Sequence, residues 1–590
     1  MQGDPLANGT EKQTDWNAID WRKANRTVRN LRQRIFRAAQ EGDWKKVRSL
    51  QKLMLKSYSN RLVSVRRVTQ VNAGKNTPGM DKLVIKTPAA RGEMVEALAH
   101  ASLWKARPAR RVYIRKRTNK LRPLGIPVVM DRCLQSMLKN ALEPAWEAKF
   151  ERISYGFRPG RSCHDAIAKI YLLARPNKTK QWVLDADIKG AFDHISHNYL
   201  QQASGPVPGK ELIKQWLKAG YVEQEMVHPT EEGTPQGGVI SPLLANIALH
   251  GMEEAMGVKY DCKGYLLGKR AVVRYADDFV CFCETREDAE QVQKILTAWL
   301  KERGLTLSEE KTRIVHLTEG FDFLGFNIRH YPAPKTSHTG WKLLIKPSRE
   351  AVQKLRTKLK ALWEQAHGNN VPTVLKKLNP VIRGWATYFR MGVAKEPFDD
   401  LDQWMFCKED HYTRHTHPKK AMWWRKQHYW GRLHLERNDS WVFGDKQTGA
   451  YLLKFGWFPI ARHVLVKGTS SPDDPQLRSY WMKRQAAKAK DLTNSKQKLA
   501  KRQHGRCPQC GESLFNEEEL QVHHLHTRAE GGKHVYSNLV LVHLLCHQHI
   551  HAASKRVLSD CQEFNTRDLL ATERKATRQT KRKEQEEQCC

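Results

Sequence analysis

The chain has 590 residues and a mass of 68.2 kDa, which is too long for one compact core and predicts several domains. Lys and Arg total 101 against 62 Asp and Glu, a formal net charge of +39, so we expect a long polyanion such as a nucleic acid as the partner. Hydrophobic residues make up 40% of the chain, which excludes a largely disordered protein.

No stretch approaches the ~20 apolar residues of a membrane helix, and the first residues lack a signal-peptide core. Twelve cysteines are too sparse for a disulfide scaffold. Three of them, Cys507, Cys510 and Cys546, fall in one histidine-rich segment, which indicates bound metal in a reducing compartment. We therefore expect a cytoplasmic protein.

Residues 22–67 carry fifteen Lys and Arg against two acidic residues. Apolar residues recur there at helical spacing, and Gly42-Asp43 is a natural break and cap. The spacing predicts two basic helices suited to an RNA backbone. A solvated charged face is the alternative for any single residue of this segment.

The pattern of apolar, polar and charged residues then changes along the chain. Between about 110 and 345, short apolar runs broken by Gly and Pro alternate with helical patterns, which predicts an α+β body. Residues 342–390 return to a basic helical pattern, and residues 411–434 are rich in aromatic and basic side chains. Residues 468–503 are first rich in Pro and Ser and then polar and charged, which is typical of a linker.

Two segments place carboxylates on expected strands. Residues 272–282 read as strand, turn and strand, with Asp277 and Asp278 in the turn. Adjacent buried carboxylates repel each other and lose water, and a divalent metal offsets both effects. A pair of exposed turn aspartates is the alternative, but a second strand, residues 182–187, puts Asp185 and Asp187 on one face. Carboxylates from separate strands are what two-metal phosphoryl transfer requires.

These and other segments resemble, in order, the sequence blocks of reverse transcriptases, and more narrowly of the proteins encoded by group II introns. The resembling segments are 77–81 (TPGMD), 116–132, 155–162 (YGFRPGRS), 187–193 (DIKGAFD), 233–238 (GTPQGG), 275–278 (YADD), 304–312 and 323–326 (FLGF). Any single block is modest evidence, but the ordered set is specific.

The resemblance implies a role for each matching residue. Asp187, Asp277 and Asp278 would bind two catalytic Mg²⁺ ions. Phe192 would crowd the sugar 2′-carbon and favour deoxynucleotides. The residues expected to hold the nucleotide are Lys116, Arg122, Gln236 and, more weakly, Lys311. Asp185 and Asp193 are expected to have supporting roles only.

Further resemblances lie beyond these blocks. Residues 381–390 resemble the thumb, or maturase, motif of the same proteins, and Trp385, Tyr388 and Phe389 are expected to pack in its core. Residues 419–432 interleave tryptophans with cations, as DNA-binding surfaces do, and lie where the family has its DNA-binding domain.

The carboxyl-terminal segment carries metal ligands at recognisable spacing. Cys507 and Cys510, and His543 and Cys546, are two pairs separated by two residues, a tetrahedral zinc pattern. His547 and His551 are four apart and would share one face of a helix.

This constellation resembles the HNH endonucleases, in which a ββα unit surrounds one divalent metal. The resemblance implies His524 as general base, Asn538 as the residue that orients its loop, and His523, His547 and His551 as metal ligands. It implies a structural zinc on Cys507, Cys510, His543 and Cys546, although His543 stands where many relatives have cysteine. A zinc module that only binds DNA is the alternative, and it leaves the extra histidines and the asparagine unexplained.

Together these observations predict a multidomain α+β protein: a right-hand polymerase (fingers and palm) with a helical thumb, a basic DNA-binding region and a ββα-metal (HNH) domain. The expected divisions are 1–80 (basic helical extension and first block), 81–345 (fingers and palm), 346–405 (thumb), 406–500 (DNA-binding domain and linker) and 501–590 (HNH domain).

The function implied is that of an RNA-directed DNA polymerase and maturase of a mobile group II intron. It would bind intron RNA to promote splicing, nick double-stranded target DNA with its HNH domain and copy the intron RNA from dNTPs by target-primed reverse transcription. We expect a ribonucleoprotein without a membrane partner, and the sequence does not determine its oligomeric state. It would be nucleoid-associated in a bacterium or reside in an organelle. The alternatives are a splicing-only maturase and a reverse transcriptase of another system with an appended nuclease.

Overall fold

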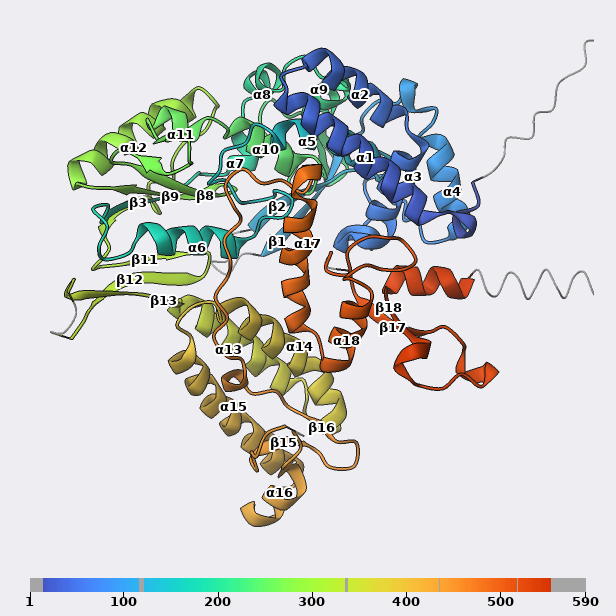
Figure 1. Cartoon of the computed structure of the whole chain (residues 1–590), viewed down its shortest axis with the longest axis vertical. Coiled ribbons are helices and arrows are strands. Elements are labelled where there is room, and N and C mark those ends of the chain that lie inside the picture. The colour runs from blue at the N-terminus through green and yellow to red at the C-terminus, as the bar shows by residue number, and fades with distance from the viewer. Residues whose placement is uncertain (1–13, 116–120, 335–337, 435, 517, 553–590) are drawn as a thin grey trace, which may run out of the picture. The chain divides into compact units, whose positions relative to one another are not determined.

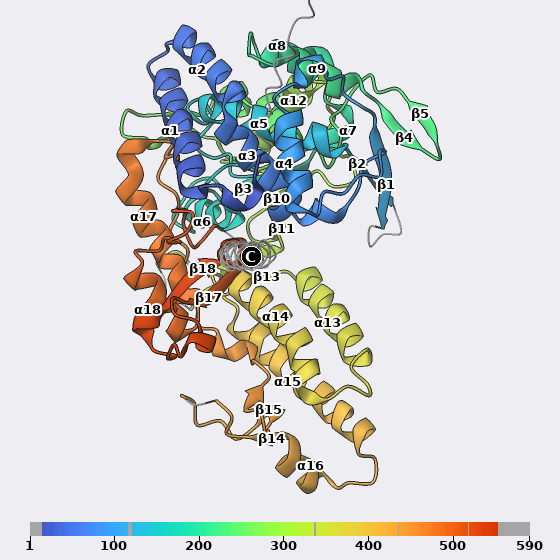
Figure 2. The same cartoon turned by 90° about the vertical axis from the view of Figure 1, so that its right-hand side faces the viewer.

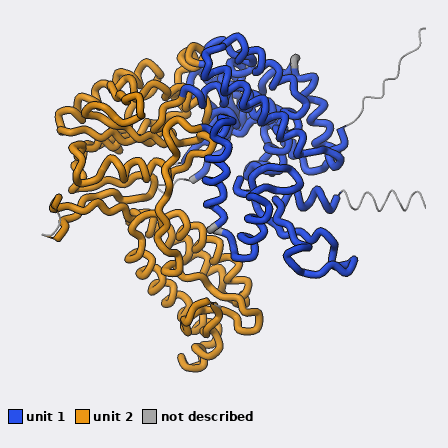
Figure 3. The backbone as a smooth tube through the Cα atoms, in the orientation of Figure 1, with its two compact units in different colours: residues 1–149, 204–241, 471–590 blue, residues 150–203, 242–470 orange. Residues whose placement is uncertain are grey.

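The computed structural model describes residues 14–552 apart from 116–120, 335–337, 435 and 517 (Figure 1). The chain is mixed α+β and folds into two compact units. Unit 1 comprises residues 1–149, 204–241 and 471–590, and unit 2 comprises residues 150–203 and 242–470 (Figure 3). Among the described helices, none combines the length and apolar character needed to cross a membrane.

Unit 1 combines a helical amino-terminal part with two small sheets. Its helices are α1 (Trp21–Gln40), α2 (Trp44–Lys56), α3 (Tyr58–Arg66), α4 (Pro88–Ala97), α5 (Val129–Glu147), α9 (Lys210–Lys218), α17 (Arg478–Ala487) and α18 (Asn494–Arg502). Its strands are β1 (Ala109–Arg115), β2 (Leu121–Ile126), β4 (Tyr221–Glu223), β5 (Met226–His228), β17 (Leu520–His524) and β18 (Leu539–His543). The larger sheet has the order β2-β1-β4-β5, and β17 pairs with β18.

The basic segment near the start folds as three helices. The side chains of Asp20 and Asp43 cap α1 and α2 by accepting hydrogen bonds from backbone N–H groups of the first turn. The predicted break at Gly42-Asp43 is confirmed. A second break occurs at Ser57, where extended backbone separates α3 from α2, so the expectation of two helices is wrong by one.

An apolar seam holds α1, α2 and α5 together. Ile35 and Met54 are fully buried in it, against Ala141 of α5. The basic residues lie on the other faces of these helices, because apolar residues at three- and four-residue spacing form one stripe.

Residues 468–503 differ from the expected linker, since most of them are helical. Asp473 is buried and forms an ion pair with Arg32 of α1 at 2.7 Å. Trp481 of α17 is also buried, and its indole N–H donates to the carbonyl of Ser471. The ion pair with the distant Arg32 and the contact within the segment order residues whose composition alone is typical of an exposed connection.

Among its described residues, unit 2 contains one four-stranded sheet, two three-stranded sheets, one two-stranded sheet and a group of helices. Its helices are α6 (Cys163–Leu173), α7 (Ala191–His194), α8 (His197–Ala203), α10 (Ser241–Ala248), α11 (Met252–Ala255), α12 (Arg286–Lys301), α13 (Arg349–Glu364), α14 (Val371–Phe389), α15 (Lys395–Thr416) and α16 (Met422–Tyr429). Its strands are β3 (Trp182–Asp187), β6 (Lys259–Tyr260), β7 (Leu266–Leu267), β8 (Ala271–Tyr275), β9 (Asp278–Cys283), β10 (Arg313–His316), β11 (Phe321–Phe323), β12 (Phe326–Pro332), β13 (Trp341–Pro347), β14 (Trp430–Gly431), β15 (Val442–Asp445) and β16 (Ala450–Tyr451).

The first sheet of unit 2 has the order β10-β3-β9-β8 and is antiparallel throughout. Its central strands, β3 and β9, are rich in buried apolar residues and are covered by α12. The strand at 182–187 and the strand-turn-strand at 272–282 were both predicted, and both are present. This sheet positions the acidic residues described below.

Helices α13, α14 and α15 lie side by side (Figures 1 and 2). Trp385 of α14 packs against Phe389 at a ring-centroid distance of 4.5 Å and contacts Phe398 of α15. Of the three aromatic residues predicted to lie in this core, Phe389 is buried, and Trp385 and Tyr388 are partly buried against its ring. In the next segment Tyr429 and Trp430 are buried, whereas 65% of Trp423 is exposed.

Candidate active site and metal centres

Asp187 and Asp278 lie directly opposite each other on paired strands. Asp187 is the last residue of β3 and Asp278 the first of β9, and their Cα atoms are register partners. Asp277 is the turn residue next to Asp278. The structure thus brings together the three carboxylates that were predicted to act together.

Electrostatics at this point favour a cation. Burial first, and then the charges of Asp277 and Asp187 and a hydrogen bond with Asp187, together raise the pKa of Asp278 to about 7. Asp278 therefore holds a proton more readily than an ordinary aspartate does when no cation is bound. A divalent metal would displace that proton and balance the charges.

A pocket of about 370 Å³ opens beside the pair. Its charged lining consists of Asp185, Asp187, Asp278, Glu310, Lys311, Arg313 and Asp322. Asp185 faces the same side as Asp187, as the strand alternation predicted. Burial raises the pKa of Asp185 to about 6, and its carboxylate accepts a hydrogen bond from Arg313 at 3.2 Å.

Lys311 reaches the acidic group from the loop that precedes β10. Its ammonium group donates to the Asp187 carboxylate. The pKa of Lys311 is raised by this hydrogen bond and by the charges of all three aspartates, although partial burial opposes the shift. The loop is fixed in place because Ser308 N–H donates to the backbone carbonyl of Asp187 at 2.8 Å.

Arg274 stabilises the turn that carries Asp277. This guanidinium is fully buried, and its Nη1 donates to the carbonyl of Ala276 at 3.2 Å and to Asn246 at 3.1 Å. Ala276 has a φ of +61°, a left-handed conformation that a non-glycine residue adopts only when its surroundings hold it there. Gly156 lies against this turn, and a Cβ there would come within 2.3 Å of the Ala276 nitrogen.

Phe192 is buried on α7, five residues after Asp187. Its ring makes an edge contact with Phe157, at a centroid distance of 6.1 Å. Gly190 precedes α7 with a φ of +54°, which lets the chain turn from β3 into this short helix.

The other predicted nucleotide-binding residues belong to unit 1. Arg122 of β2 donates from Nε to the side-chain oxygen of Gln236 at 2.9 Å, so the structure brings these two predicted residues together. The Gln236 backbone carbonyl also accepts from Gly125 N–H. Lys116 lies outside the described residues.

The acidic group fits Mg²⁺. Its donors are carboxylate oxygens from separate strands, the ligand type that this hard cation prefers. The raised pKa of Asp278 supplies an observation in the same direction, because burial first, and then the charges of Asp277 and Asp187, disfavour its ionised form, and a cation would offset both effects.

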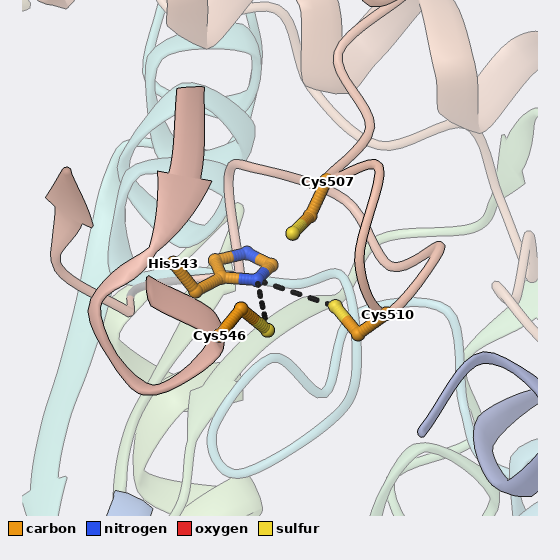
Figure 4. Close-up of side chains that lie close together, drawn as sticks. All are labelled: Cys507, Cys510, His543 and Cys546. Carbon is orange, nitrogen blue, oxygen red and sulfur yellow. Dashed lines mark hydrogen bonds between the residues drawn. The ribbon is translucent and has the colours of Figure 1, made fainter. Parts of the chain in front are cut away.

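Cys507, Cys510, His543 and Cys546 converge in one buried group (Figure 4). One ligand atom from each lies within 4.8 Å of the others. The His543 Nδ1 faces the Cys510 and Cys546 sulfurs, while its Nε2 lies 3.0 Å from the carbonyl of Ser513. This second contact orients the ring with Nδ1 toward the sulfurs, as a zinc ligand requires.

When no ion is bound, the members of this group differ in protonation: the pKa of Cys510 is raised, so it stays a thiol, and a metal would displace protons from Cys510 and His543. Hydrogen bonds from Cys510 and Cys546 lower the pKa of the Cys507 thiol, so that it carries thiolate character. Burial acts against the charge on His543, yet hydrogen bonds to Cys507 and Cys546 raise its pKa to about 10. Sulfur and imidazole donors at this spacing fit a tetrahedral zinc ion.

His523, His547 and His551 form a second group whose ligand atoms lie within 4.8 Å of one another. His523 comes from β17, and the other two come from the helical residues 544–552. The Nε2 atoms of His547 and His551 are only 3.3 Å apart. Imidazole nitrogens that point at one another in this way are suited to sharing a cation.

His524 is adjacent in sequence but faces the opposite side of β17, as strand alternation requires. Its Nε2 lies 3.0 Å from Nδ1 of His534. Partial burial, with the nearby Arg528 and His534, lowers the pKa of His524 and favours the neutral ring that a general base needs.

Asn538 joins the loop after β17 to the loop before β18. Its amide nitrogen donates to the carbonyls of His526 and Lys533, and its oxygen accepts from His526 N–H at 2.7 Å. This three-way contact is the geometry that the predicted orienting role requires.

Some residues at these sites were not anticipated from the sequence. Arg274 lies next to the predicted turn, but nothing in the spacing distinguishes a buried arginine from an exposed one. Glu310 and Asp322 enter the acidic pocket from segments far along the chain. His534 carried a weak signal, as one more histidine between His524 and Asn538.

Four family models match successive parts of the chain. They describe an N-terminal domain of reverse transcriptase (residues 16–98), a reverse transcriptase or RNA-dependent DNA polymerase (residues 114–328), a group II intron maturase-specific domain (residues 352–430) and an HNH endonuclease (residues 507–553). Their order is the order of the segments described above.

Similar proteins occur in bacteria and in eukaryotes. Protein YkfC of Escherichia coli is 34% identical over 316 residues, 45% of this chain and 80% of that protein. The group II intron-encoded protein LtrA of Lactococcus lactis is 32% identical over 283 residues, 38% of this chain and 47% of LtrA, so the match spans about half of LtrA. An uncharacterized 91 kDa protein in the cob intron of Schizosaccharomyces pombe is 27% identical, over 54% of this chain and 48% of that protein.

Among solved structures, a telomerase from Candida albicans in complex with a telomeric RNA fragment aligns with a TM-score of 0.29 and 15% identity, over 53% of this chain and 58% of that one. The family assignment rests on the sequence matches. The chain belongs to the group II intron reverse transcriptase/maturase family and carries reverse transcriptase, maturase and HNH endonuclease domains.

Proposed function

We propose that the protein is the RNA-directed DNA polymerase and maturase of a mobile group II intron. It binds the intron RNA to promote splicing, nicks the target DNA with its HNH domain, and copies the intron RNA into DNA from the nicked end. The observation that carries the polymerase assignment is the convergence of Asp187, Asp277 and Asp278 at the ends of β3 and β9.

In this proposal the sheet β10-β3-β9-β8 is the palm, α13 to α15 form the thumb, and β17, β18 and residues 544–552 form the ββα-metal unit. The domain divisions expected from the sequence, at about residues 80, 345, 405 and 500, are proposed to hold. The net charge of +39 supports nucleic acids as partners, with intron RNA and double-stranded target DNA as the two binding targets.

At the polymerase site, Asp187, Asp277 and Asp278 would hold two Mg²⁺ ions. When bound, such ions activate the primer 3′-hydroxyl and stabilise the pyrophosphate leaving group. Lys311 neutralises part of the carboxylate charge and orients Asp187. Phe192 restricts the space at the sugar 2′-carbon, and Lys116, Arg122 and Gln236 hold the triphosphate and base of the incoming dNTP.

At the nuclease site, His524 accepts the proton of the attacking water, and Asn538 keeps the His524 loop in position. His523, His547 and His551 would hold one divalent cation, which stabilises the developing charge on the scissile phosphate. Cys507, Cys510, His543 and Cys546 would hold a structural Zn²⁺ that fixes the start of the helical residues 544–552.

A primer-extension assay tests the polymerase assignment. Wild-type protein should incorporate dNTPs on an RNA template in Mg²⁺, and the Asp277→Asn/Asp278→Asn variant should lose at least 10³-fold, about 4 kcal/mol. Asp399→Asn is the matched control, because Asp399 is exposed and forms a surface ion pair with Lys395. Undiminished incorporation by the double variant would refute the assignment.

The nuclease is tested in a particle reconstituted with intron RNA. His524→Ala should abolish target-strand nicking and leave primer extension intact. His526→Ala is the matched control, because the backbone of His526, and not its side chain, bonds with Asn538. Nicking that survives in the His524 variant would remove the general-base role.

The same assays separate the alternatives. A splicing-only maturase would promote intron splicing without any templated incorporation. A reverse transcriptase of another system would extend primers but would not be encoded within a group II ribozyme, so the sequence of the RNA flanking the gene decides between them. We also propose that the protein is located at the nucleoid of a bacterium or in an organelle, because its proposed targets are intron RNA and double-stranded DNA.

A further inference from the structure

Arg66 reaches the Cys/His group from outside the HNH segment. It is the last residue of α3, in the region that matches the N-terminal domain of reverse transcriptase. Its Nη2 donates to the sulfur of Cys546 at 3.3 Å, across 480 positions of sequence. Both residues belong to unit 1 (Figure 3).

The environment of Arg66 contains a sulfur where a carboxylate would be expected. Its side chain is buried, with 8% of the residue exposed, and its guanidinium lies over the ring of Trp21 at 4.5 Å. Within the part of the chain that the structure describes, no carboxylate forms an ion pair with Arg66. A buried arginine needs a counter-charge, and Cys546 is the one potential anion that bonds to it there.

Other contacts place the same loop against α1. Arg29 forms an ion pair with Glu512 at 2.8 Å. Gly511 lies against Arg22, where a Cβ would come within 3.2 Å of the Arg22 side chain. The Cys507–Cys510 loop therefore rests on the amino-terminal helices, so Arg66 meets Cys546 within a larger contact.

Charge balance explains why an arginine belongs at this point. Three thiolates and a neutral imidazole around a divalent zinc leave an excess negative charge in a buried site. A guanidinium that donates an N–H to one thiolate balances this charge and lowers the basicity of that thiolate. Partners of this kind outside the ligand set typically contribute 10- to 100-fold to metal affinity.

We infer that Arg66 is a positioning residue that completes the zinc centre from the reverse transcriptase region and thereby ties the nuclease helix to that region. The inference rests on the proposed zinc site. Cys546 is followed directly by His547, a proposed ligand of the nuclease metal, on the same helical residues 544–552. The Arg66 contact therefore sets the position of this helix as well as the charge of the zinc centre.

Zinc release measures the effect directly. Full-length protein is purified, its zinc content is determined, and loss of zinc to a chromogenic chelator is followed. Arg66→Met should release zinc about 10- to 100-fold faster than wild type, and Arg66→Lys, which keeps the charge, should fall between them. Arg29→Met is the matched control, because its ion pair with Glu512 is on the surface, and it should stay within about twofold of wild type.

Cobalt substitution gives a readout that a purely structural contact would not move. With Co²⁺ in the site, the thiolate-to-cobalt absorption band should shift in Arg66→Met, because the Cys546 thiolate loses a hydrogen bond. Primer extension serves as the check on folding and should remain at the wild-type level. If Arg66→Met does not accumulate as folded protein, the comparison of wild type with Arg66→Lys decides.

The outcomes distinguish the two claims. Wild-type protein without bound zinc would refute the proposed zinc site, and the inference with it. Wild-type protein that holds one zinc, together with an Arg66→Met variant that releases it at the wild-type rate with an unshifted cobalt band, would overturn the inference and leave the zinc site standing.

Discussion

Replacing Arg274 with methionine should loosen the turn that carries Asp277 and Asp278. Methionine keeps most of the length and apolar volume of the side chain but removes its donors. The carbonyl of Ala276 and the amide oxygen of Asn246 then lose the hydrogen bonds that Arg274 gives them at 3.2 and 3.1 Å. Ala276 would no longer be held in its left-handed conformation, since the contact that fixes its carbonyl is gone.

The magnitude follows from burial. Hydrogen bonds from a charged donor contribute about 1.5–3 kcal/mol each. The Glu151 carboxylate, 3.8 Å from Nη2 of Arg274, would remain buried without its counter-charge, and breaking such a pair costs about 3–5 kcal/mol. Part of this is offset, because burial already disfavours the charged arginine and lowers its pKa to about 10. We expect a net loss of about 3 kcal/mol in the local stability of the hairpin.

Hydrogen–deuterium exchange measures this local stability without assuming that the whole chain unfolds in one step. Residues 271–283 should exchange roughly 100-fold faster in Arg274→Met, since 1.4 kcal/mol corresponds to a factor of ten. Residues 21–40 provide the internal control and should not change. Adding Glu151→Gln should recover much of the loss, because it removes the unpaired charge. Unaltered exchange at 271–283, with undiminished primer extension, would refute the role given to Arg274.

Three further predictions concern other parts of the chain. Phe192→Ala should admit ribonucleotides, so incorporation of NTPs relative to dNTPs should rise by at least tenfold in a primer-extension competition, and an unchanged ratio would exclude Phe192 from the sugar site. Burial raises the pKa of Glu409 to about 7, which means that the folded state binds a proton between about pH 4.5 and 7 that the unfolded state does not. The stability of the 395–451 region should therefore decrease as pH rises through this window, and Glu409→Gln, which still accepts from Trp430, should flatten the melting profile; a profile that stays as steep would contradict this. Asn538→Ala should reduce nicking by about 10- to 100-fold with zinc content unchanged, and wild-type nicking would show that its loop contacts are dispensable.

The strands that carry the acidic residues could be predicted from the sequence, and the reason is physical. β3 and β9 are short apolar runs that carry carboxylates, and buried strands tolerate such residues only at their ends or at a functional site. The spacing of Cys507, Cys510, His543 and Cys546 was informative in the same way, since metal ligation constrains local geometry.

Contacts between segments that are distant in the chain could not be predicted from the spacing of residues. Arg66 resembles its many basic neighbours until the fold brings it to Cys546. Residues 468–503 have the composition of a linker, and it is the contact of Asp473 with Arg32 that orders their start. The pairing of Arg122 with Gln236 likewise depends on the sheet that brings β2 beside residue 236.

The position of the catalytic metals is the most direct test of the polymerase assignment. Crystals of the protein with an RNA template, a DNA primer, a non-hydrolysable dNTP and Mn²⁺ in place of Mg²⁺ would locate the ions by anomalous scattering. We expect two peaks bounded by the carboxylates of Asp187, Asp277 and Asp278. Manganese bound to the nucleotide at a place remote from these three residues would contradict the account.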